Sequence, residues 1–133
     1  MSQPEFLQAI PVLRIFDEAK AKAFYLDFLG FRVDWEHRFA PEAPLFLQVS
    51  RSGLILHLSE HHGDACPGSA TTIIMNGLDA FHAEVTTKNN PFMKPGIEQE
   101  PWDARAMTVI DPFGNRLLFR EPNQKATLSA FAG

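Results

Sequence analysis

Two tryptophans with acidic neighbours are the first candidates for chemistry in this sequence. Trp35 stands between Asp34 and Glu36, and Trp102 is followed by Asp103. An aromatic ring offers area for stacking, while nearby carboxylates attract positive charge. This combination is typical of a site for a flat, cationic ligand. The alternative is that these rings only pack against a sheet.

Three further residues could line the same site. Phe39 and Phe46 follow Trp35 in the chain, and His57 lies among leucines on a predicted strand. Because side chains alternate along a strand, His57 should face away from Leu56 and Leu58. It could then hydrogen-bond a ligand, or it could be a histidine of the wall with no role in chemistry.

A second polar group lies in the middle of the chain, at His61, His62, Asp64 and Cys66. Its spacing matches no metal site with a geometric basis, and nothing in the sequence indicates a nucleophilic role for the Cys66 thiol. We therefore expect ordinary surface polarity in this segment. A single cysteine cannot form an internal disulfide, which fits a reduced, cytoplasmic setting.

The elements that must position these residues are duplicated. Residues Gly53–Glu60 read GLILHLSE, and residues Gly114–Glu121 read GNRLLFRE, 61 positions later. Each stretch follows a short apolar run with strand character. Such a repeat predicts two copies of one supersecondary unit, with a ligand bound between equivalent faces.

Hydrophobic periodicity and turn residues predict a strand, a helix and three strands in each copy. In the first copy, we expect strands over 7–16, 31–39, 45–49 and 54–59, and a helix over 18–29. In the second, we expect strands over 70–75, 97–102, 105–110 and 116–120, a helix over 78–88 and a turn at 111–115. Within 31–39, the alternation places Val33 and Trp35 on one face.

The fold class is therefore α+β, with paired βαβββ modules that form a curved mixed sheet. We expect one domain over 1–133, in which module one spans about 7–60 and module two about 70–122. Residues 61–69 link the modules, and 123–133 form a tail that could be either a short helix or an arm. The net charge of −4 argues against a nucleic-acid partner, and no apolar run is long enough to span a membrane. The first residues do not read as a signal peptide.

Several stretches together resemble the glyoxalase/bleomycin-resistance/extradiol-dioxygenase superfamily, and its bleomycin-resistance proteins most closely. The stretches are AIPVLRIFD at 9–17, FYLDFLGFRVDW at 24–35, NGLDAFHAE at 76–84, EQEPWDAR at 98–105 and DPFGNRLLF at 111–119. The resemblance implies a homodimer in which the first strand, with Pro11, crosses to the partner. It also implies a drug stacked between aromatic residues of both subunits, with Phe39 and Trp102 at the matching positions.

Enzymes of this superfamily hold a divalent metal, and the resemblance carries their ligand positions to four places here. These places are Ile10, His57, Ala70 or Thr71, and Leu118. Only His57 can ligate a metal, whereas such a site needs about three protein ligands. We therefore expect no metal, no cofactor and no catalysis.

The leading hypothesis is a non-catalytic protein that sequesters bleomycin-family antibiotics in grooves at the dimer interface. Its expected ligand-binding residues are Asp34, Trp35, Glu36, Phe39, Phe46, His57, Trp102 and Asp103. One alternative is a metal-dependent lyase, transferase or dioxygenase with a displaced site, in which His57 acts with His37 or Glu60. Another is a binder of a different small aromatic metabolite.

Overall fold

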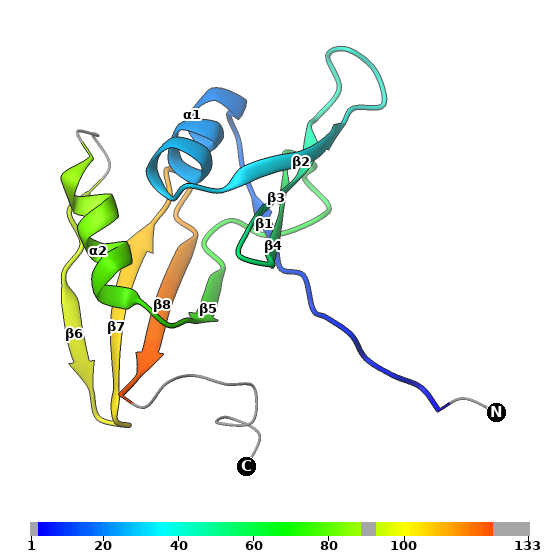
Figure 1. Ribbon diagram of the computed structural model, residues 1–133. Helices are drawn as coiled ribbons and strands as arrows, with labels where there is room; N and C mark the ends of the chain where they lie inside the picture. Colours follow the sequence, from blue (N-terminus) through cyan, green and yellow to red (C-terminus); the bar gives the residue numbers. More distant parts are fainter. Residues whose placement is uncertain (1–2, 89–92, 124–133) are drawn as a thin grey trace.

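The computed structural model describes residues 3–88 and 93–123, which form two copies of the same βαβββ unit (Figure 1). Module one contains β1 (Val12–Arg14), α1 (Glu18–Lys22), the π-helical segment η1 (Ala23–Phe28), β2 (Arg32–His37), β3 (Phe46–Arg51) and β4 (Leu54–Ser59). Module two contains β5 (Ala70–Ile74), α2 (Leu78–Thr87), β6 (Ile97–Glu100), β7 (Ala104–Ile110) and β8 (Arg116–Pro122). The predicted α+β class and module order are confirmed.

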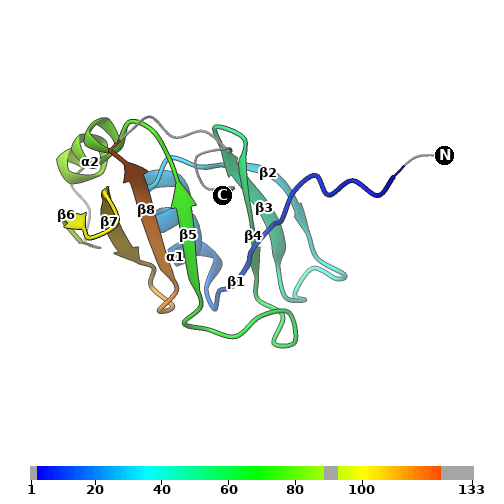
Figure 2. The ribbon, with the colours of Figure 1, turned by 90° about the horizontal axis from the view of Figure 1, so that it is seen from below.

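Each module has its own four-stranded mixed sheet. The strand orders are β1-β4-β3-β2 and β5-β8-β7-β6, and the first strand of each module runs parallel to the last. The eight predicted strands are therefore divided between two sheets, which Figure 2 shows at an angle to each other. His57 pairs with Val12 in one sheet, and Leu118 pairs with Thr72 in the other. The two pairs confirm that His57 and Leu118 are equivalent positions.

The predicted strand over 7–16 is shorter than expected. Only Val12–Arg14 form β1, and residues 3–10 are exposed. The carbonyl of Pro11 still accepts a hydrogen bond from the His57 amide, at 3.0 Å, an ordinary length for such a bond. A strand requires a hydrogen-bonding neighbour, and within one chain β4 provides one only from Pro11 onward. The residues before it leave the body of the molecule as an extended arm (Figure 1).

The first helix begins as expected but widens along its length. The Asp17 carboxylate caps it by accepting from the Lys20 amide at 2.8 Å. After Lys22 the backbone changes from α to π geometry, and the next residues include Phe24, Tyr25 and Phe28, all buried. The ring of Phe24 lies 5.0 Å from that of Tyr25 and 5.3 Å from that of Phe28. This segment therefore carries the largest side chains of the core.

Buried side chains of both modules form one core cluster. Across it, the Tyr25 hydroxyl donates to the Asp111 carboxylate at 2.6 Å, and the Asn115 amide donates to the Arg14 carbonyl at 2.8 Å. These contacts fix the position of one sheet relative to the other. Among the described residues, no helix has the length and apolar character needed to cross a membrane.

Candidate ligand-binding site

Three of the predicted residues meet on the exposed side of the first sheet. The rings of Trp35 and Phe46 are stacked, with centroids 5.9 Å apart and planes at 14°. The His57 ring meets both edge-on, at 5.4 Å from Trp35 and 5.1 Å from Phe46. We call Trp35, Phe46 and His57 the aromatic face.

Strand alternation explains how β3 and β4 build this face. Leu56 and Leu58 are fully buried, whereas His57 between them is only partly buried, as the sequence predicts. On β3, Leu47 and Val49 face the core, and Phe46 points the other way. Partial burial lowers the pKa of His57, so its imidazole is neutral near pH 7.

The geometry of β2 differs from the prediction because the strand contains a bulge at Asp34. Val33 pairs with Val49, but Trp35 pairs with Gln48, so two residues of β2 span a single step of β3. Val33 and Trp35 therefore lie on opposite faces, and the expectation that they share one face is wrong. The bulge instead places the neighbours Asp34 and Trp35 on the same exposed face.

Asp34 is anchored beside the rings by a polar network that includes Gln48, a residue not singled out from the sequence. The Asp34 carboxylate accepts hydrogen bonds at 3.0 Å from both the Gln48 amide and the Ser50 hydroxyl. These bonds lower the pKa of Asp34 and keep it charged. Gln48 also contacts the His57 ring, with Oε1 2.9 Å from Nε2.

An open, polar pocket of about 650 Å³ adjoins the aromatic face. Asp34, Gln48 and Ser50 contribute to its lining, together with the exposed Arg32, whose Nε lies 3.5 Å from Asp34 Oδ1. The exposed side of module one thus offers stacking area, and next to it a carboxylate and several hydrogen-bonding groups. That arrangement can hold a flat ring system with a cationic or hydrogen-bonding extension.

Two other predicted residues of this region lie apart from the aromatic face. Glu36 pairs with Leu47, which faces the core, and it forms an ion pair with Lys22 of α1 at 2.5 Å. It therefore points away from the rings. Phe39 follows β2 and is largely exposed; its ring lies 4.6 Å from that of His37 and 6.0 Å from that of His61.

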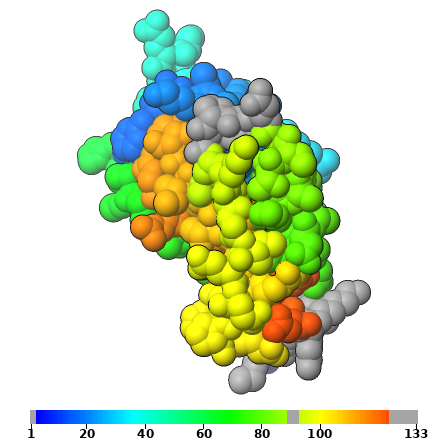
Figure 3. Space-filling model, turned by 90° about the vertical axis from the view of Figure 1, so that its left-hand side faces the viewer, coloured from blue at the N-terminus to red at the C-terminus, as the bar shows by residue number. Residues whose placement is uncertain are grey.

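Trp102 and Asp103 belong to module two, in the turn between β6 and β7. The guanidinium of Arg120 covers the Trp102 ring, 5.3 Å from its centroid, and Arg120 also pairs with Glu100 at 2.7 Å. Asp103 accepts through its carbonyl from the Asn123 amide at 3.0 Å. Figure 3 shows this side of the molecule, where β6 and α2 form the surface. One chain thus does not bring Trp102 into contact with the aromatic face.

The metal-ligand positions of the superfamily hold an unsuitable set of side chains. The ladders place Val12 beside His57, and Thr72 beside Leu118. His57 is the only strong ligand among these four. Within 3–88 and 93–123, no three His, Cys, Asp or Glu side chains form a group that could hold a metal. The donor set does not fit a divalent ion.

The linker residues form a turn at the end of β4. The Asp64 carboxylate accepts from the Ser59 hydroxyl at 2.6 Å, and the same hydroxyl oxygen accepts from the His61 amide at 3.0 Å. Cys66 is an exposed, free thiol. Asp64 therefore closes the turn through a hydrogen bond.

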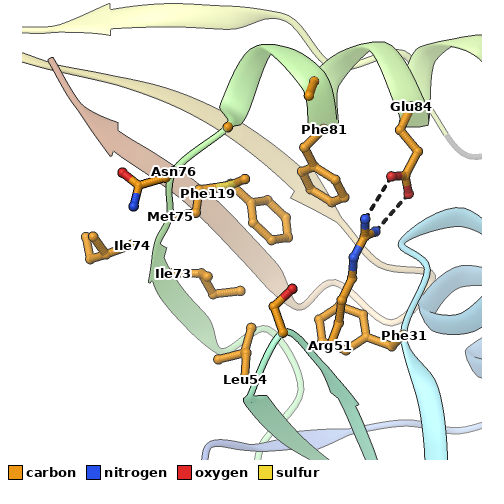
Figure 4. A pocket seen from close by; sticks show the side chains of 13 residues that line it. Phe31, Arg51, Leu54, Ile73, Ile74, Met75, Asn76, Phe81, Glu84 and Phe119 are labelled. Carbon is orange, nitrogen blue, oxygen red and sulfur yellow. Dashed lines mark hydrogen bonds and ion pairs between the residues drawn. The ribbon is translucent and has the colours of Figure 1, made fainter. Parts of the chain in front are cut away.

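A second pocket, of about 750 Å³, lies between the modules and away from the aromatic face (Figure 4). Its lining is mainly apolar, with Phe81, Phe119 and Ile73 at its base. Its charged groups, Arg51 and Glu84, bind each other through two hydrogen bonds of 2.7 and 2.8 Å. Because they satisfy each other, the pocket offers no free charge to an ionic ligand. The aromatic face, with its partly exposed rings beside the Asp34 carboxylate, is the better candidate for a cationic aromatic ligand.

Comparison with solved structures identifies antibiotic-binding proteins of the same architecture. A bleomycin-binding protein from the bleomycin producer Streptomyces verticillus, solved with copper(II)-bleomycin, is 30% identical and has a TM-score of 0.65; the match covers 88% of this chain and 97% of that one. A bleomycin resistance determinant encoded on transposon Tn5 is 18% identical, with a TM-score of 0.67 and coverages of 88% and 98%. TnmS3, an antibiotic-binding protein from Streptomyces sp. CB03234, is 21% identical, with a TM-score of 0.65 and coverages of 90% and 99%. Among curated proteins, none matches the chain.

The sequence model of a family described as "Glyoxalase superfamily protein" matches residues 1–126. This match covers nearly the whole chain and agrees with the duplicated βαβββ unit, its parallel first and last strands, and the equivalence of His57 and Leu118. The chain therefore belongs to the glyoxalase superfamily, and its structural relatives include bleomycin-binding and bleomycin-resistance proteins.

Proposed function

We propose that this protein binds bleomycin-family antibiotics without changing them, and that its aromatic face holds the flat part of the drug. The observation that carries the proposal is the stacked pair of Trp35 and Phe46, with the Asp34 carboxylate on the same face. Stacking supplies apolar contact area, and the carboxylate attracts the positive charge of the drug. The relative from Streptomyces verticillus, which was solved with copper(II)-bleomycin, supports this ligand class.

A second copy of the chain completes the site in this proposal. Trp102 lies on module two, so it can reach the aromatic face only if module two of a partner stands opposite module one. The extended arm before Pro11 supports such a pairing, because Phe6 and Leu7 on it are 99% and 84% exposed. In the dimer, the arm packs on the partner, and Phe39 and Trp102 close the groove from the two subunits.

The proposed activity is protection by mass action in the cytoplasm. Bound antibiotic is removed from the free pool, and no bond is made or broken. Catalysis through the superfamily's metal would require ligands that Val12, Thr72 and Leu118 do not supply. The proposal therefore assigns no catalytic residue and no cofactor.

Calorimetric titration with copper(II)-bleomycin tests the proposal. We expect sub-micromolar binding near one drug per chain, and a loss of about tenfold in affinity for Trp35→Ala, since stacking contributes on the order of 1 kcal/mol beyond area. Asp34→Asn should weaken binding several-fold. Asp79→Asn is the matched control, because Asp79 is also an exposed carboxylate with a lowered pKa but lies on α2. Absence of binding heat, with no protection of DNA in a cleavage assay, contradicts the proposal.

The dimer is tested by sedimentation of the full chain and of a variant that lacks residues 1–10. We expect the full chain to sediment as a dimer and the shortened chain to dissociate at low micromolar concentration. A full chain that remains monomeric at high concentration contradicts the shared groove.

A further inference from the structure

A chain of three polar side chains connects the polar pocket to the aromatic face. The Asp34 carboxylate accepts from the Gln48 amide nitrogen at 3.0 Å, and Gln48 Oε1 lies 2.9 Å from His57 Nε2. The three residues come from three adjacent strands, β2, β3 and β4, and the bulge of β2 brings Asp34 within reach of Gln48. The sequence alone does not place them together.

The chemistry of the three groups determines the direction of each hydrogen bond. An ionised carboxylate only accepts, so the NH₂ group of Gln48 must face Asp34, and its carbonyl oxygen must face His57. A carbonyl oxygen also only accepts, so His57 Nε2 must carry a hydrogen. In a neutral imidazole the other ring nitrogen, Nδ1, is then an acceptor.

The surroundings of His57 leave this acceptor available. Among the described residues, no group donates to Nδ1, and the ladder neighbour across from His57 is the apolar Val12. Partial burial keeps the imidazole neutral near pH 7, as noted above. Gln48 and His57 are ladder partners on β3 and β4. Module two has no counterpart, since the equivalent partners on β7 and β8 are Thr108 and Leu118.

We infer that Gln48, oriented by Asp34, is a positioning residue that holds His57 as the Nε2–H tautomer, so that the aromatic face presents a hydrogen-bond acceptor beside its rings. The ligand that fits is a flat aromatic cation with an N–H or O–H donor at its edge. The part of this inference that concerns the ligand rests on the proposed function. The part that concerns the tautomer does not.

Nitrogen NMR of histidine-labelled protein tests the tautomer directly, well above the ordinary histidine pKa of about 6.5. We expect His57 to show a protonated Nε2 and an unprotonated Nδ1, with its signals assigned by their loss in His57→Gln. Gln48→Leu should shift His57 toward a mixture of tautomers. Ser50→Ala is the matched control, because it removes the other hydrogen bond to Asp34 and leaves the chain through Gln48 intact. A protonated Nδ1 in the native protein, or no shift in Gln48→Leu, overturns the inference.

Two acridinium ions test the ligand. 9-Aminoacridinium and N-methylacridinium share a flat ring system and a single positive charge, but only the first has N–H donors. We expect the native protein and Asp79→Asn, whose change lies on α2 away from the aromatic face, to prefer 9-aminoacridinium by about tenfold, the worth of one hydrogen bond to a charged group. Gln48→Leu should lose this preference while it still binds both ions. Equal affinities in the native protein, or failure to bind either ion, overturn the ligand part.

These results separate the two proposals. If copper(II)-bleomycin does not bind but the His57 tautomer is as expected, only the proposed function fails. If bleomycin binds and the tautomer differs, only this inference fails.

Discussion

Two polar contacts at equivalent places in the fold link the two modules, and these two joints differ. In one, Asp111, directly after β7, accepts a hydrogen bond from Tyr25 of η1 at 2.6 Å. In the other, Arg51, at the end of β3, donates to Glu84 of α2 at 2.7 Å. Each is a contact from a strand-end turn of one module to the helix of the other, as a duplicated unit predicts. We call them the tyrosine joint and the arginine joint.

The tyrosine joint is buried and filled. Its five-residue turn, Asp111–Asn115, is closed by the Asp111 carboxylate, which accepts from the amides of Phe113 and Asn115. The Phe113 ring packs 6.0 Å from that of Phe16 and so occupies space beside the joint. This turn is longer than the one at the other joint, and it contributes a side chain, Phe113, that fills the space beside the joint.

The arginine joint is half open. Its turn has only Ser52 and Gly53, and both have positive φ, so the hairpin is as short as possible. Arg51 and Glu84 are each 35% exposed. This two-residue turn carries no ring equivalent to Phe113, and the apolar pocket of Figure 4 lies there. The same duplicated unit thus has one joint that stabilises the fold and one that leaves a hollow.

The largest expected effect is the loss of the tyrosine joint in Asp111→Ala. The change leaves the Tyr25 hydroxyl and the Asn115 amide without their buried acceptor, and it removes the bonds that close the turn. We expect a loss of about 3 kcal/mol or more in the free energy of unfolding, measured with urea. Asp79→Ala, at an exposed ion pair with Arg105, should cost far less, because solvent screens an exposed pair. Equal losses in the two variants would contradict a strong stabilising role of the tyrosine joint.

Tyr25→Phe should remove a smaller part of the same joint, about 1–2 kcal/mol at neutral pH. Burial, and then the Asp111 charge, raise the pKa of Tyr25 well above its ordinary value. The phenol therefore stabilises the fold below the ordinary tyrosine pKa of about 10, and this contribution declines as the pH rises above it. We expect the native protein to lose stability at alkaline pH more steeply than Tyr25→Phe. Identical alkaline profiles would contradict the buried phenol.

The arginine joint should contribute less. Because its side chains are one-third exposed, we expect Glu84→Gln to cost about 0.5–1 kcal/mol, and less at high salt. Arg51 lowers the pKa of Glu84, so the contribution is present above the ordinary glutamate pKa and is lost as the pH falls through the folded value. Urea titrations at neutral and acidic pH measure the difference. A loss as large as that of Asp111→Ala would remove the contrast between the joints.

The smallest expected effect is a gain. Ala80 is exposed on α2 and lines the hollow, whereas Ala83 on the same helix does not. Ala80→Phe should place a ring where Phe113 lies in the other joint and raise the free energy of unfolding by about 0.5 kcal/mol. Ala83→Phe has the same helix propensity and no hollow to fill, so it should be neutral or slightly destabilising. Equal behaviour of the two variants would show that the hollow does not accept a ring.

Local patterns in the sequence determined much of the fold. Gly53 and Gly114 begin the two repeated stretches, and both have the positive φ that favours glycine in a tight turn. Gly30 follows the first helix at φ +78°, and a Cβ there would lie 2.5 Å from the Arg51 guanidinium. Strand alternation likewise predicted the outward direction of His57. Each of these features depends on residues close together in the chain.

The candidate site was predictable only in part. Trp35, Phe46 and His57 were expected to contribute, and they meet on one face. The bulge of β2 could not be read from the sequence, because Asp34 and Trp35 share a face only through their register with β3. The same register turns Glu36 toward Lys22 and brings Gln48 between Asp34 and His57. The predicted tail over 123–133 lies outside the described residues, apart from Asn123.

By itself, the sequence determined the order of the strands and helices, the duplication and the mismatch of His57 with Leu118. Those properties follow from local periodicity and residue type, which need no knowledge of distant partners. Only the tertiary structure decided the register of β2 and the two joints, because Tyr25 and Asp111 are 86 residues apart and Arg51 and Glu84 are 33 apart. Contacts at such separations form only when both modules have folded and packed against each other.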